Sequence, residues 1–344
     1  MKTDLFNFEL PEQLIAQKPS EKREEARLLV LDRKTNNLDN RFFYDIPNLL
    51  PKDSVLVLND TKVIPARLVG VKENTNASIE ILLLKELKSN EWEALCKPAK
   101  KVKIGSIINV LNNDNKIVIS FECIGERDEG IRIFKTKYEG IFLERLEEVG
   151  RLPLPPYIRK QLVGDDRYQT VYANHNGSAA APTAGFHFTE EVLAKIKNKG
   201  IEIIYVTLHV GLGTFRPVKE TDISKHEMHK ERYVITEEAS EKLNKAKKAG
   251  KKIIAVGTTS VRTLESNFVN DKFYPGQFET SIFIYPGYQF RVVDHIITNF
   301  HLPKSTLVML ISAFAGRDAI INSYKYAISE KYRFFSFGDS MFIK

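Results

Sequence analysis

The sequence has few cysteines and no long apolar run, and each absence excludes a class of protein. Cys96 and Cys123 are its only cysteines and form no CxxC pair, which excludes a disulfide-stapled module and a four-cysteine zinc site. The longest apolar run, 307–315, is less than half of the ~20 residues that cross a bilayer. The first residues include an acid and no long apolar segment, unlike a signal peptide. We expect a cytoplasmic globular protein whose cysteines pack inside strands.

The sequence also has no large excess of one charge, because 51 Lys and Arg against 44 Asp and Glu give a net charge of only +7. A small positive excess indicates a polyanionic partner only where the positive residues are clustered. Two clusters occur, with tyrosines near the second, and their expected contact residues are Lys97, Lys100, Lys101 and Lys103, then Arg151 and Arg159. Basic and aromatic side chains together suit RNA backbones and bases. A solvated charged face is the alternative for each cluster alone.

The first half of the chain has the pattern of a small β domain. A buried-strand run at 54–59 is followed by strand-like segments about ten residues apart. We predict strands at about 66–72, 78–85, 91–96, 105–111, 116–124 and 130–135. The sequence Asn112–Asn115 signals a hairpin turn. Six short strands with polar turns are typical of a small barrel or sandwich.

The second half alternates strands and helices. A helix is predicted over 138–149, and the prolines that follow impose an extended connection. Further on we predict strands at 201–208, 252–257 and 280–285, and helices at 237–249, from about 259, at 305–315 and at 317–330. Strand runs at 27–31 and 55–58 can join the same sheet. We therefore predict an α/β fold, a discontinuous layered domain of residues 1–65 and 150–344, with a small β-barrel domain inserted at 66–149.

The loop 181–189 combines small residues with Thr183 and His187 and ends at Thr189, a predicted helix N-cap. Small residues let a ligand approach the backbone closely. A tight loop in which His187 is merely hydrogen-bonded is an equal alternative.

A second loop, 207–215, opens a strand into glycines. It contains His209, Gly211 and Gly213, and strand ends that open into such loops are where α/β sheets bind ligands. Arg216 occupies the position where the dinucleotide fingerprint GxGxxG needs its third glycine, so we exclude a nicotinamide site of that type.

A helix start at 257–266 follows a third strand and carries Thr258, Thr259 and Arg262. Free amides and hydroxyls at a helix N-terminus can hold a carboxylate or phosphate, and Arg262 adds charge. The alternative is a well-capped helix in which Arg262 pairs with Glu265.

Three further positions remain open between a chemical and a structural role. The segment 226–231 lacks the HExxH spacing of a zinc site, so we expect no metal, and Glu231 or a histidine is the more economical proton acceptor. His301 is either a site residue or the anchor of the turn 298–303. Asp60, directly after the strand 54–59, is either a site residue or a turn cap.

Taken together, these segments resemble the S-adenosylmethionine:tRNA ribosyltransferase-isomerase family of queuosine biosynthesis. The resemblance runs along nearly the whole chain. The matching segments are Phe8–Pro11, Leu14–Gln17, Leu28–Arg33, Val57–Arg67, Lys97–Lys101, Pro153–Ile158, Tyr168–Ala173, 181–189, 207–215, 257–266, 298–303 and Tyr332–Met341.

The resemblance implies that S-adenosylmethionine donates its ribosyl part to 7-aminomethyl-7-deazaguanine at the tRNA wobble position, giving epoxyqueuosine-tRNA, adenine and methionine. It also implies tRNAs for Tyr, His, Asn and Asp as substrates. Because the sulfonium acidifies the neighbouring ribose C5′ protons, a carboxylate or imidazole can remove one, and adenine needs a proton as it leaves. We expect no metal or redox cofactor, and a monomer by default.

On this basis, we assign catalytic and substrate-binding roles to residues of the polar loops as hypotheses. Proton transfer is assigned to His187, His209 or Glu231. The methionine carboxylate is assigned to Thr258, Thr259 and Arg262. The other expected substrate contacts are Asp60, Arg67, Thr183, Gly211, Gly213, His301 and Asp339. A non-catalytic RNA-binding protein and a Rossmann-type methyltransferase are the alternatives.

Overall fold

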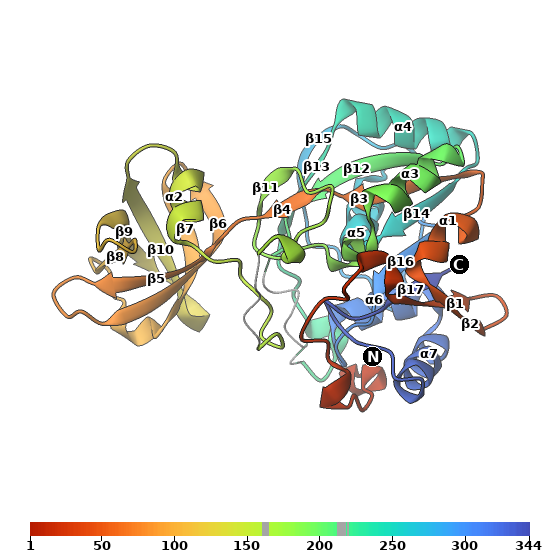
Figure 1. The fold of residues 1–344 in the computed structure, drawn as a ribbon, viewed down its shortest axis with the longest axis horizontal. Helices are drawn as coiled ribbons and strands as arrows, with labels where there is room; N and C mark the ends of the chain where they lie inside the picture. Colours follow the sequence, from red (N-terminus) through yellow and green to blue (C-terminus); the bar gives the residue numbers. More distant parts are fainter. Residues whose placement is uncertain (160–164, 212–217, 219) are drawn as a thin grey trace. The chain divides into compact units, whose positions relative to one another are not determined.

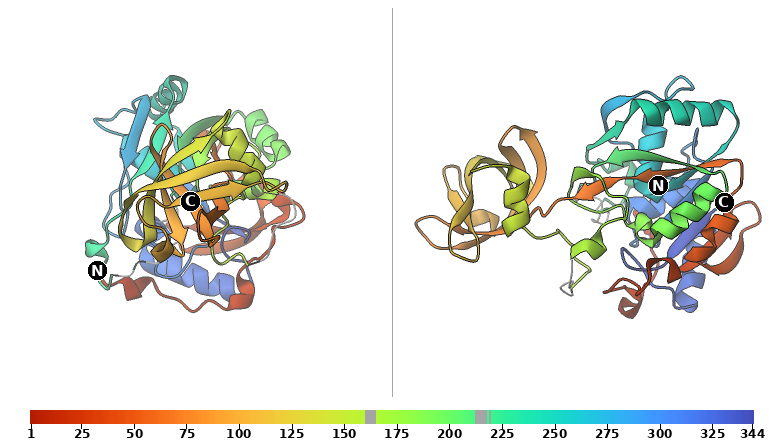
Figure 2. Two further views of the ribbon diagram at one scale, coloured as in Figure 1. Left: turned by 90° about the vertical axis from the view of Figure 1, so that its left-hand side faces the viewer. Right: turned by 45° about the horizontal axis from the view of Figure 1, so that its top comes forward.

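A computed structural model describes residues 1–159, 165–211, 218 and 220–344. The chain folds into two compact units (Figures 1 and 2). The larger consists of Met1–Lys62, Pro155–His175 and Ala181–Lys344, and the smaller of Val63–Leu154 and Asn176–Ala180. The larger unit is therefore built from segments on both sides of an insertion. The insertion was expected at 66–149, and the return of 176–180 to it was not foreseen.

The smaller unit is a closed barrel of six strands in the order β10-β7-β6-β5-β8-β9. Its strands are β5 (Arg67–Lys72), β6 (Ser78–Lys88), β7 (Glu91–Lys97), β8 (Ile107–Leu111), β9 (Ile117–Glu126) and β10 (Ile131–Tyr138). The predicted turn joins β8 to β9, where the Asn112 side chain accepts the Asp114 and Lys116 N–H groups, both at 3.1 Å. The barrel expected from the strand spacing is confirmed.

Two details of the barrel concern its cysteines and its helix. Cys96 and Cys123 are buried and free, and burial raises the pKa of the Cys96 thiol to about 12, so both are packing residues as expected. Helix α2 (Phe142–Val149) begins later than the predicted residue 138. The reason is that Tyr138 still pairs with Ile119 of β9.

Among the described residues of the larger unit, nine strands form one mixed sheet. In spatial order they are β15 (Gly276–Thr280), β13 (Glu231–Ile235), β12 (Glu202–Leu208), β3 (Ser54–Asn59), β14 (Lys252–Val256), β16 (His295–Asn299), β17 (Ser340–Ile343), β1 (Arg27–Asp32) and β2 (Asn37–Phe42). The two ends of the chain meet in it, because β17 pairs in parallel with β1. A separate pair consists of β4 (Thr61–Val63) and β11 (His175–Ser178).

The strand predicted at 280–285 is wrong, since β15 ends at Thr280. Among the apolar residues that prompted the prediction, Ile284 is buried and Ile282, Phe283 and Tyr285 are half-buried, all outside the paired strands. Packing without strand pairing therefore gave this segment the composition of a strand.

Helices cover the sheet, as expected of an α/β layer structure. They are α1 (Ile46–Leu49), α3 (Glu190–Asn198), α4 (Glu237–Lys248), α5 (Gly257–Asn267), α6 (Thr306–Ala315) and α7 (Arg317–Ser329). The predicted caps are confirmed, because Thr189 accepts the Val192 N–H at 3.2 Å and Ser305 the Val308 N–H at 3.3 Å. No helix in the described part of the chain is long and apolar enough to span a bilayer.

The core of the larger unit explains why β3 is buried along its whole length. Leu56 and Leu58 pack in one cluster with Phe188, Val192 and Ile196 at helix α3. Side chains alternate along a strand, so Val55 and the other odd positions face the opposite side. Both faces of this strand are covered, and its polar neighbours can lie only at its ends.

Candidate active site

Four parallel strands of the larger unit end at the same edge of the sheet. Strands β12, β3, β14 and β16 are hydrogen-bonded in this order and all run in parallel. Ligands of open α/β sheets bind beyond the carboxyl ends of such strands. The residues that follow these four ends include Asp60, His209, Gly257 and His301, so the polar loops of the sequence meet at one edge.

A pocket of about 410 Å³ lies at this edge. Its lining is Ala181, Pro182, Thr183, Ala184, Val210, Gly257, Thr258, Thr259, Thr298, Asn299, His301 and Leu307. The structure thus brings together four of the expected substrate contacts from three separate segments, namely Thr183, Thr258, Thr259 and His301.

The start of helix α5 forms one wall of the pocket. Gly257 lies at φ +82°, a left-handed conformation that side chains disfavour, and it turns the chain from β14 directly into the helix. Thr258 and Thr259 then occupy the first helical turn. The Thr259 hydroxyl is buried without a hydrogen-bond partner among the described residues. This helix start therefore has a free donor next to its positive dipole end.

Arg262, one turn further along α5, forms a buried ion pair with Glu231 at the start of β13. The other carboxylate oxygen of Glu231 accepts the Gly211 N–H at 3.1 Å. Arg262 contacts Glu231 through Nη1, and its Nε and Nη2 atoms are buried without a partner in the described part of the chain. In a guanidinium group, Nε and Nη2 form the edge that can bind a carboxylate through two parallel hydrogen bonds.

The alternative pairing of Arg262 with Glu265 is wrong. Glu265 instead accepts the backbone N–H groups of Val292 and Val293, at 3.1 and 3.0 Å, and the Tyr288 hydroxyl at 3.0 Å. Glu265, one turn away on α5, therefore fixes the loop 288–293. The partner of Arg262 is Glu231, which lies on strand β13.

His209 follows β12 and is half-buried beside the end of β3. Its Nδ1 shares a hydrogen bond of 2.8 Å with the Thr61 hydroxyl. Burial, together with the nearby His175 and Arg232, lowers the pKa of His209 below its ordinary value. The imidazole is therefore neutral at pH 7 and can accept a proton.

Asp60 lies next to this histidine at the end of β3. It accepts the Thr207 hydroxyl at 2.6 Å, and its second oxygen is 3.5 Å from His175 Nε2. Burial raises the pKa of Asp60, against the opposing effects of Thr207 and His175. His175 was not expected in this region, because it is far away in sequence and no motif marks it.

His187 does not line the 410 Å³ pocket but is linked to it through Asn299. The Asn299 amide nitrogen is 3.1 Å from His187 Nε2, and its oxygen accepts the Thr183 hydroxyl at 3.3 Å. Burial lowers the pKa of His187 to about 3. His187 is thus a neutral, hydrogen-bonded residue, and Asn299 is a pocket residue that we did not single out from the sequence.

His301 and Asp339 have structural contacts. His301 contacts the Thr298 hydroxyl through Nε2 at 3.1 Å and the Tyr324 hydroxyl through Nδ1 at 3.3 Å, and burial lowers its pKa to about 3. The two oxygens of Asp339 accept the N–H groups of Arg27 and Arg333, at 2.9 and 2.7 Å. Asp339 therefore joins β1 to the segment before β17.

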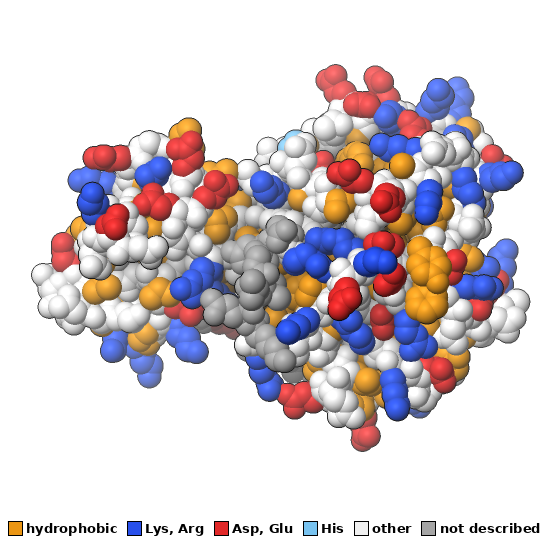
Figure 3. All heavy atoms as spheres, in the orientation of Figure 1, with side chains coloured by type: hydrophobic (Ala, Val, Ile, Leu, Met, Phe, Trp, Pro, Cys, Tyr) orange, Lys and Arg blue, Asp and Glu red, His pale blue; other side chains and the backbone are white. Residues whose placement is uncertain are grey.

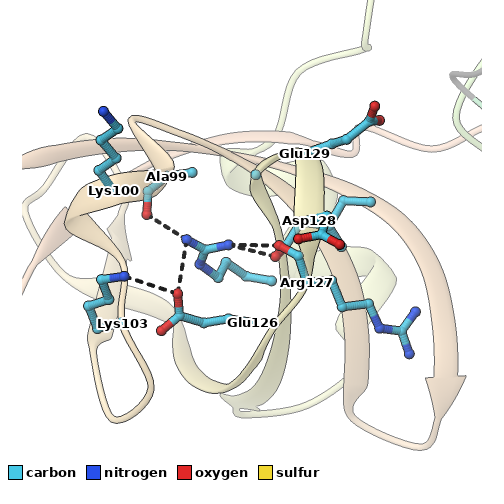
Figure 4. A pocket seen from close by; sticks show the side chains of 10 residues that line it. Ala99, Lys100, Lys103, Glu126, Arg127, Asp128 and Glu129 are labelled. Carbon is cyan, nitrogen blue, oxygen red and sulfur yellow. Dashed lines mark hydrogen bonds and ion pairs between the residues drawn. The ribbon is translucent and has the colours of Figure 1, made fainter.

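The expected tRNA-contact lysines share one loop of the barrel, around the short helix η5 (Ala99–Lys101). Lys97, Lys100, Lys101 and Lys103 are all exposed. Figure 4 shows Lys103 directed to Glu126, 3.2 Å away, and Lys100 pointing elsewhere. Figure 3 shows basic and acidic side chains interspersed on this face of both units.

Three other expected contacts lie outside this loop. In the smaller unit, the backbones of Arg67 and Arg151 pair as an isolated antiparallel β-bridge. Arg159 belongs to the larger unit and forms an ion pair with Glu12 at 2.7 Å. Gly213 falls outside the described residues. Within residues 1–159, 165–211, 218 and 220–344, no group of three His, Cys, Asp or Glu side chains is placed to hold a metal ion.

Comparisons with known proteins agree along the whole chain. The family model described as "Queuosine biosynthesis protein" matches residues 3–343. Proteins named S-adenosylmethionine:tRNA ribosyltransferase-isomerase from Staphylococcus aureus strains Newman and JH9 are each 55% identical over 344 residues, 100% of this chain and of each relative. The crystal structure of S-adenosylmethionine tRNA ribosyltransferase from Thermotoga maritima is 37% identical with a TM-score of 0.57, covering 99% of this chain and 100% of that one.

Proposed function

The chain belongs to the queuosine biosynthesis protein family, and we propose that it is an S-adenosylmethionine:tRNA ribosyltransferase-isomerase. The enzyme transfers and isomerises the ribosyl moiety of S-adenosylmethionine onto 7-aminomethyl-7-deazaguanine at the tRNA wobble position. Its products are epoxyqueuosine-tRNA, adenine and methionine. Relatives of that name cover its full length at 55% identity.

One observation supports the location of this reaction most strongly. Arg262 and Thr259 are buried, at 5% and 8% exposure, on the first turns of α5, and the bidentate edge of the one and the hydroxyl of the other have no hydrogen-bond partner among the residues that the structure describes. Buried hydrogen-bond donors without a partner are costly, and a carboxylate would accept hydrogen bonds from them. The methionine end of S-adenosylmethionine carries such a carboxylate. We therefore assign Thr258, Thr259 and Arg262 to it, with Glu231 fixing the guanidinium.

Proton removal from ribose C5′ is best assigned to His209. Glu231 is already bound to Arg262 and to the Gly211 N–H, so it is poorly placed to act as a base. His187 has a pKa of about 3 and is too weak a base. His209 is neutral and more exposed, and Thr61 orients its ring.

The pocket can also keep the attacking amine neutral. The tRNA aminomethyl group attacks through its lone pair, so a protonated amine cannot react. His301 lines the pocket in its neutral form, and no Asp or Glu is among the lining residues. A surface with hydroxyl, amide and imidazole groups but without a carboxylate does not favour the ammonium form.

We assign tRNA contact to the barrel loop. Changing Lys100 and Lys101 together to Gln is expected to weaken tRNA binding and to reduce the slope of log K against log [salt] by about 1.4–1.8, because about 0.7–0.9 is lost per phosphate contact. Binding isotherms at several salt concentrations measure this. The matched control is Lys88 and Lys135 to Gln, exposed barrel lysines outside the loop. An unchanged slope in the loop variant would exclude this loop from the interface.

Three further assignments rest on the family resemblance. We propose a cytoplasmic enzyme, because its tRNA substrate is present there. We also propose tRNAs for Tyr, His, Asn and Asp as substrates and a monomer as the active form. The chemistry assigned here uses S-adenosylmethionine as a substrate and calls for no metal or redox group.

Analysis of the small-molecule products tests the function. The protein is incubated with S-adenosylmethionine and tRNA carrying 7-aminomethyl-7-deazaguanine, and products are identified by mass spectrometry. Adenine and methionine are expected in equal amounts. Formation of S-adenosylhomocysteine would instead identify a methyltransferase, and tRNA binding without any product would identify a non-catalytic RNA-binding protein.

A further inference from the structure

A second pocket in the larger unit continues the candidate active site. It has about 350 Å³ of empty space, within the range of about 300–1,000 Å³ that is usual for ligand pockets. Its lining is Tyr157, Thr183, Asn299, Phe300, His301, Leu302, Ser305, Leu307, Phe335 and Ser336. Four of these residues, Thr183, Asn299, His301 and Leu307, also line the 410 Å³ pocket. The two pockets therefore share one wall, and all their lining residues belong to the larger unit.

The part of the second pocket outside the shared wall is largely aromatic and apolar. Tyr157 and Phe335 pack against each other with their ring centroids 4.8 Å apart, and Leu302 adds apolar surface. Tyr157 is half-buried, and its hydroxyl shares a hydrogen bond of 2.7 Å with the Ser336 hydroxyl. The ten residues that line this pocket are all uncharged at pH 7, since burial lowers the pKa of His301 to about 3. Such a surface suits a flat, neutral ring better than a carboxylate or a phosphate.

Phe335 has a backbone conformation that aromatic residues rarely adopt. Its φ is +71°, in the left-handed region, where a bulky side chain is an outlier. Its N–H donates to the Phe300 carbonyl at 3.1 Å, and its carbonyl accepts the Gly338 N–H at 2.9 Å and the Asn299 amide at 3.4 Å. Strain of this kind persists only where the surrounding structure fixes it, and it is concentrated at functional sites. The fold thus holds the Phe335 ring in the pocket wall at some cost in free energy.

The chemical character of the joined pockets changes from one end to the other. Thr258 and Thr259 of α5 line only the first pocket, and the aromatic pair lines only the second. The shared wall between them presents hydroxyl, amide and imidazole groups. S-adenosylmethionine has the same order of groups, namely a carboxylate, a ribose with two hydroxyls and a neutral adenine ring. Because the carboxylate is assigned to the start of α5, the adenine ring falls at the aromatic end.

A pocket of the barrel does not fit this ligand. Figure 4 shows charged side chains around it, among them Lys100, Lys103 and Glu126. No aromatic residue is among the described residues that line it. A neutral purine would find charged groups there and no ring on which to stack.

We propose that the pocket lined by Tyr157 and Phe335 binds the adenine ring of S-adenosylmethionine, which stacks on Tyr157. This inference rests on the proposed function for the identity of the ligand. Free adenine, a product of the reaction, occupies the same pocket and competes there with S-adenosylmethionine.

The test measures inhibition by free adenine, with S-adenosylmethionine as the varied substrate, in Tyr157→Leu. Leucine keeps an apolar side chain but removes the ring. We expect the inhibition constant of adenine to rise about 5- to 50-fold, as for the loss of one stack between a base and an aromatic ring. The inhibition constant of methionine should stay within about twofold. Arg262→Lys should show the reverse pattern, with a larger change for methionine than for adenine.

The matched control for the loss of a ring is Tyr44→Leu. Tyr44 stacks on Phe42 with ring centroids 5.3 Å apart, is 43% exposed and lines neither pocket. We expect neither inhibition constant to change in this variant. Thermal unfolding confirms that each variant is folded.

The outcomes separate the possible occupants of the pocket. An unchanged adenine inhibition constant in folded Tyr157→Leu would overturn the proposal. A weaker affinity for tRNA carrying 7-aminomethyl-7-deazaguanine, with unchanged inhibition by adenine, would also overturn it, because the pocket would then hold the tRNA base. Should wild type form no product, the proposed function fails, while equilibrium binding of adenine to wild type and Tyr157→Leu still tests this pocket. If Tyr157→Leu destabilises the fold, Phe335→Leu replaces it, with the same criterion on adenine.

Discussion

Replacing Arg262 by Lys is expected to raise the KM for S-adenosylmethionine about 10- to 100-fold. A hydrogen bond to a charged group contributes about 1.5–3 kcal/mol, and lysine cannot offer the bidentate edge of a guanidinium. The positive charge next to Glu231 is kept, so the buried carboxylate does not lose its partner. Steady-state kinetics at saturating tRNA separates KM from kcat, and we expect the larger change in KM.

Arg232, the residue after Glu231 on β13, supplies a control for the Arg262→Lys variant. Arg232 forms a surface pair with Glu279, at 4.0 Å, and Arg232→Lys is expected to leave the KM within about twofold, since surface pairs contribute about 0–1 kcal/mol. Complete removal of charge in Arg262→Ala should also destabilise the fold by about 3–5 kcal/mol, because the buried Glu231 carboxylate would lose the positive charge of its ion pair. A KM for S-adenosylmethionine close to wild type in Arg262→Lys would show that the Nε and Nη2 edge of Arg262 does not bind the methionine carboxylate.

The second large effect is expected at His209. His209→Ala should lower kcat about 10²- to 10⁴-fold, the usual contribution of a positioned general base, and leave the tRNA Kd almost unchanged. Single-turnover formation of adenine and tRNA binding isotherms measure the two quantities. The control is His229→Ala, an exposed histidine close to β13, for which we expect normal turnover. Near-normal turnover of His209→Ala would exclude this residue as the base.

The pH dependence gives a further check on the same residue. The pKa of His209 is lowered by burial, His175 and Arg232, so its neutral, active form should persist below pH 6.5, the ordinary value for histidine. The acid limb of kcat/KM is therefore expected below that pH. His175→Gln removes a neighbour that lowers the pKa of His209, so this pKa should rise and the limb should move to higher pH.

Much of the fold follows from local sequence patterns. The strands of the barrel and the turn at Asn112–Asn115 are marked by alternation and by turn residues, whose effects act within a few positions. The same holds for the caps Thr189 and Ser305. The errors occur where tertiary contacts decide, as at Ile284, which is buried outside the sheet, and at Tyr138, which extends β10 at the expense of α2.

The candidate site was predictable as a set of loops but not as a set of contacts. Strand ends with glycines and hydroxyls indicated the correct edge of the sheet, since parallel strands end together. The partner of Arg262 could not be found in the same way, because Glu265 is nearer in sequence while Glu231 is nearer in space. His175 and Asn299 were missed for the same reason, since only the folded chain places them beside Asp60 and His187.

Tracing the ribose carbons of S-adenosylmethionine is the decisive experiment for ribosyl transfer by this protein. S-adenosylmethionine labelled in those carbons is incubated with the enzyme and tRNA carrying 7-aminomethyl-7-deazaguanine, and the digested tRNA is examined by mass spectrometry. We expect the whole ribosyl label in the modified nucleoside, with unlabelled adenine and methionine released, and a large loss of this transfer in His209→Ala. Label that remains in small molecules, or transfer of a methyl group alone to the RNA, would contradict ribosyl transfer.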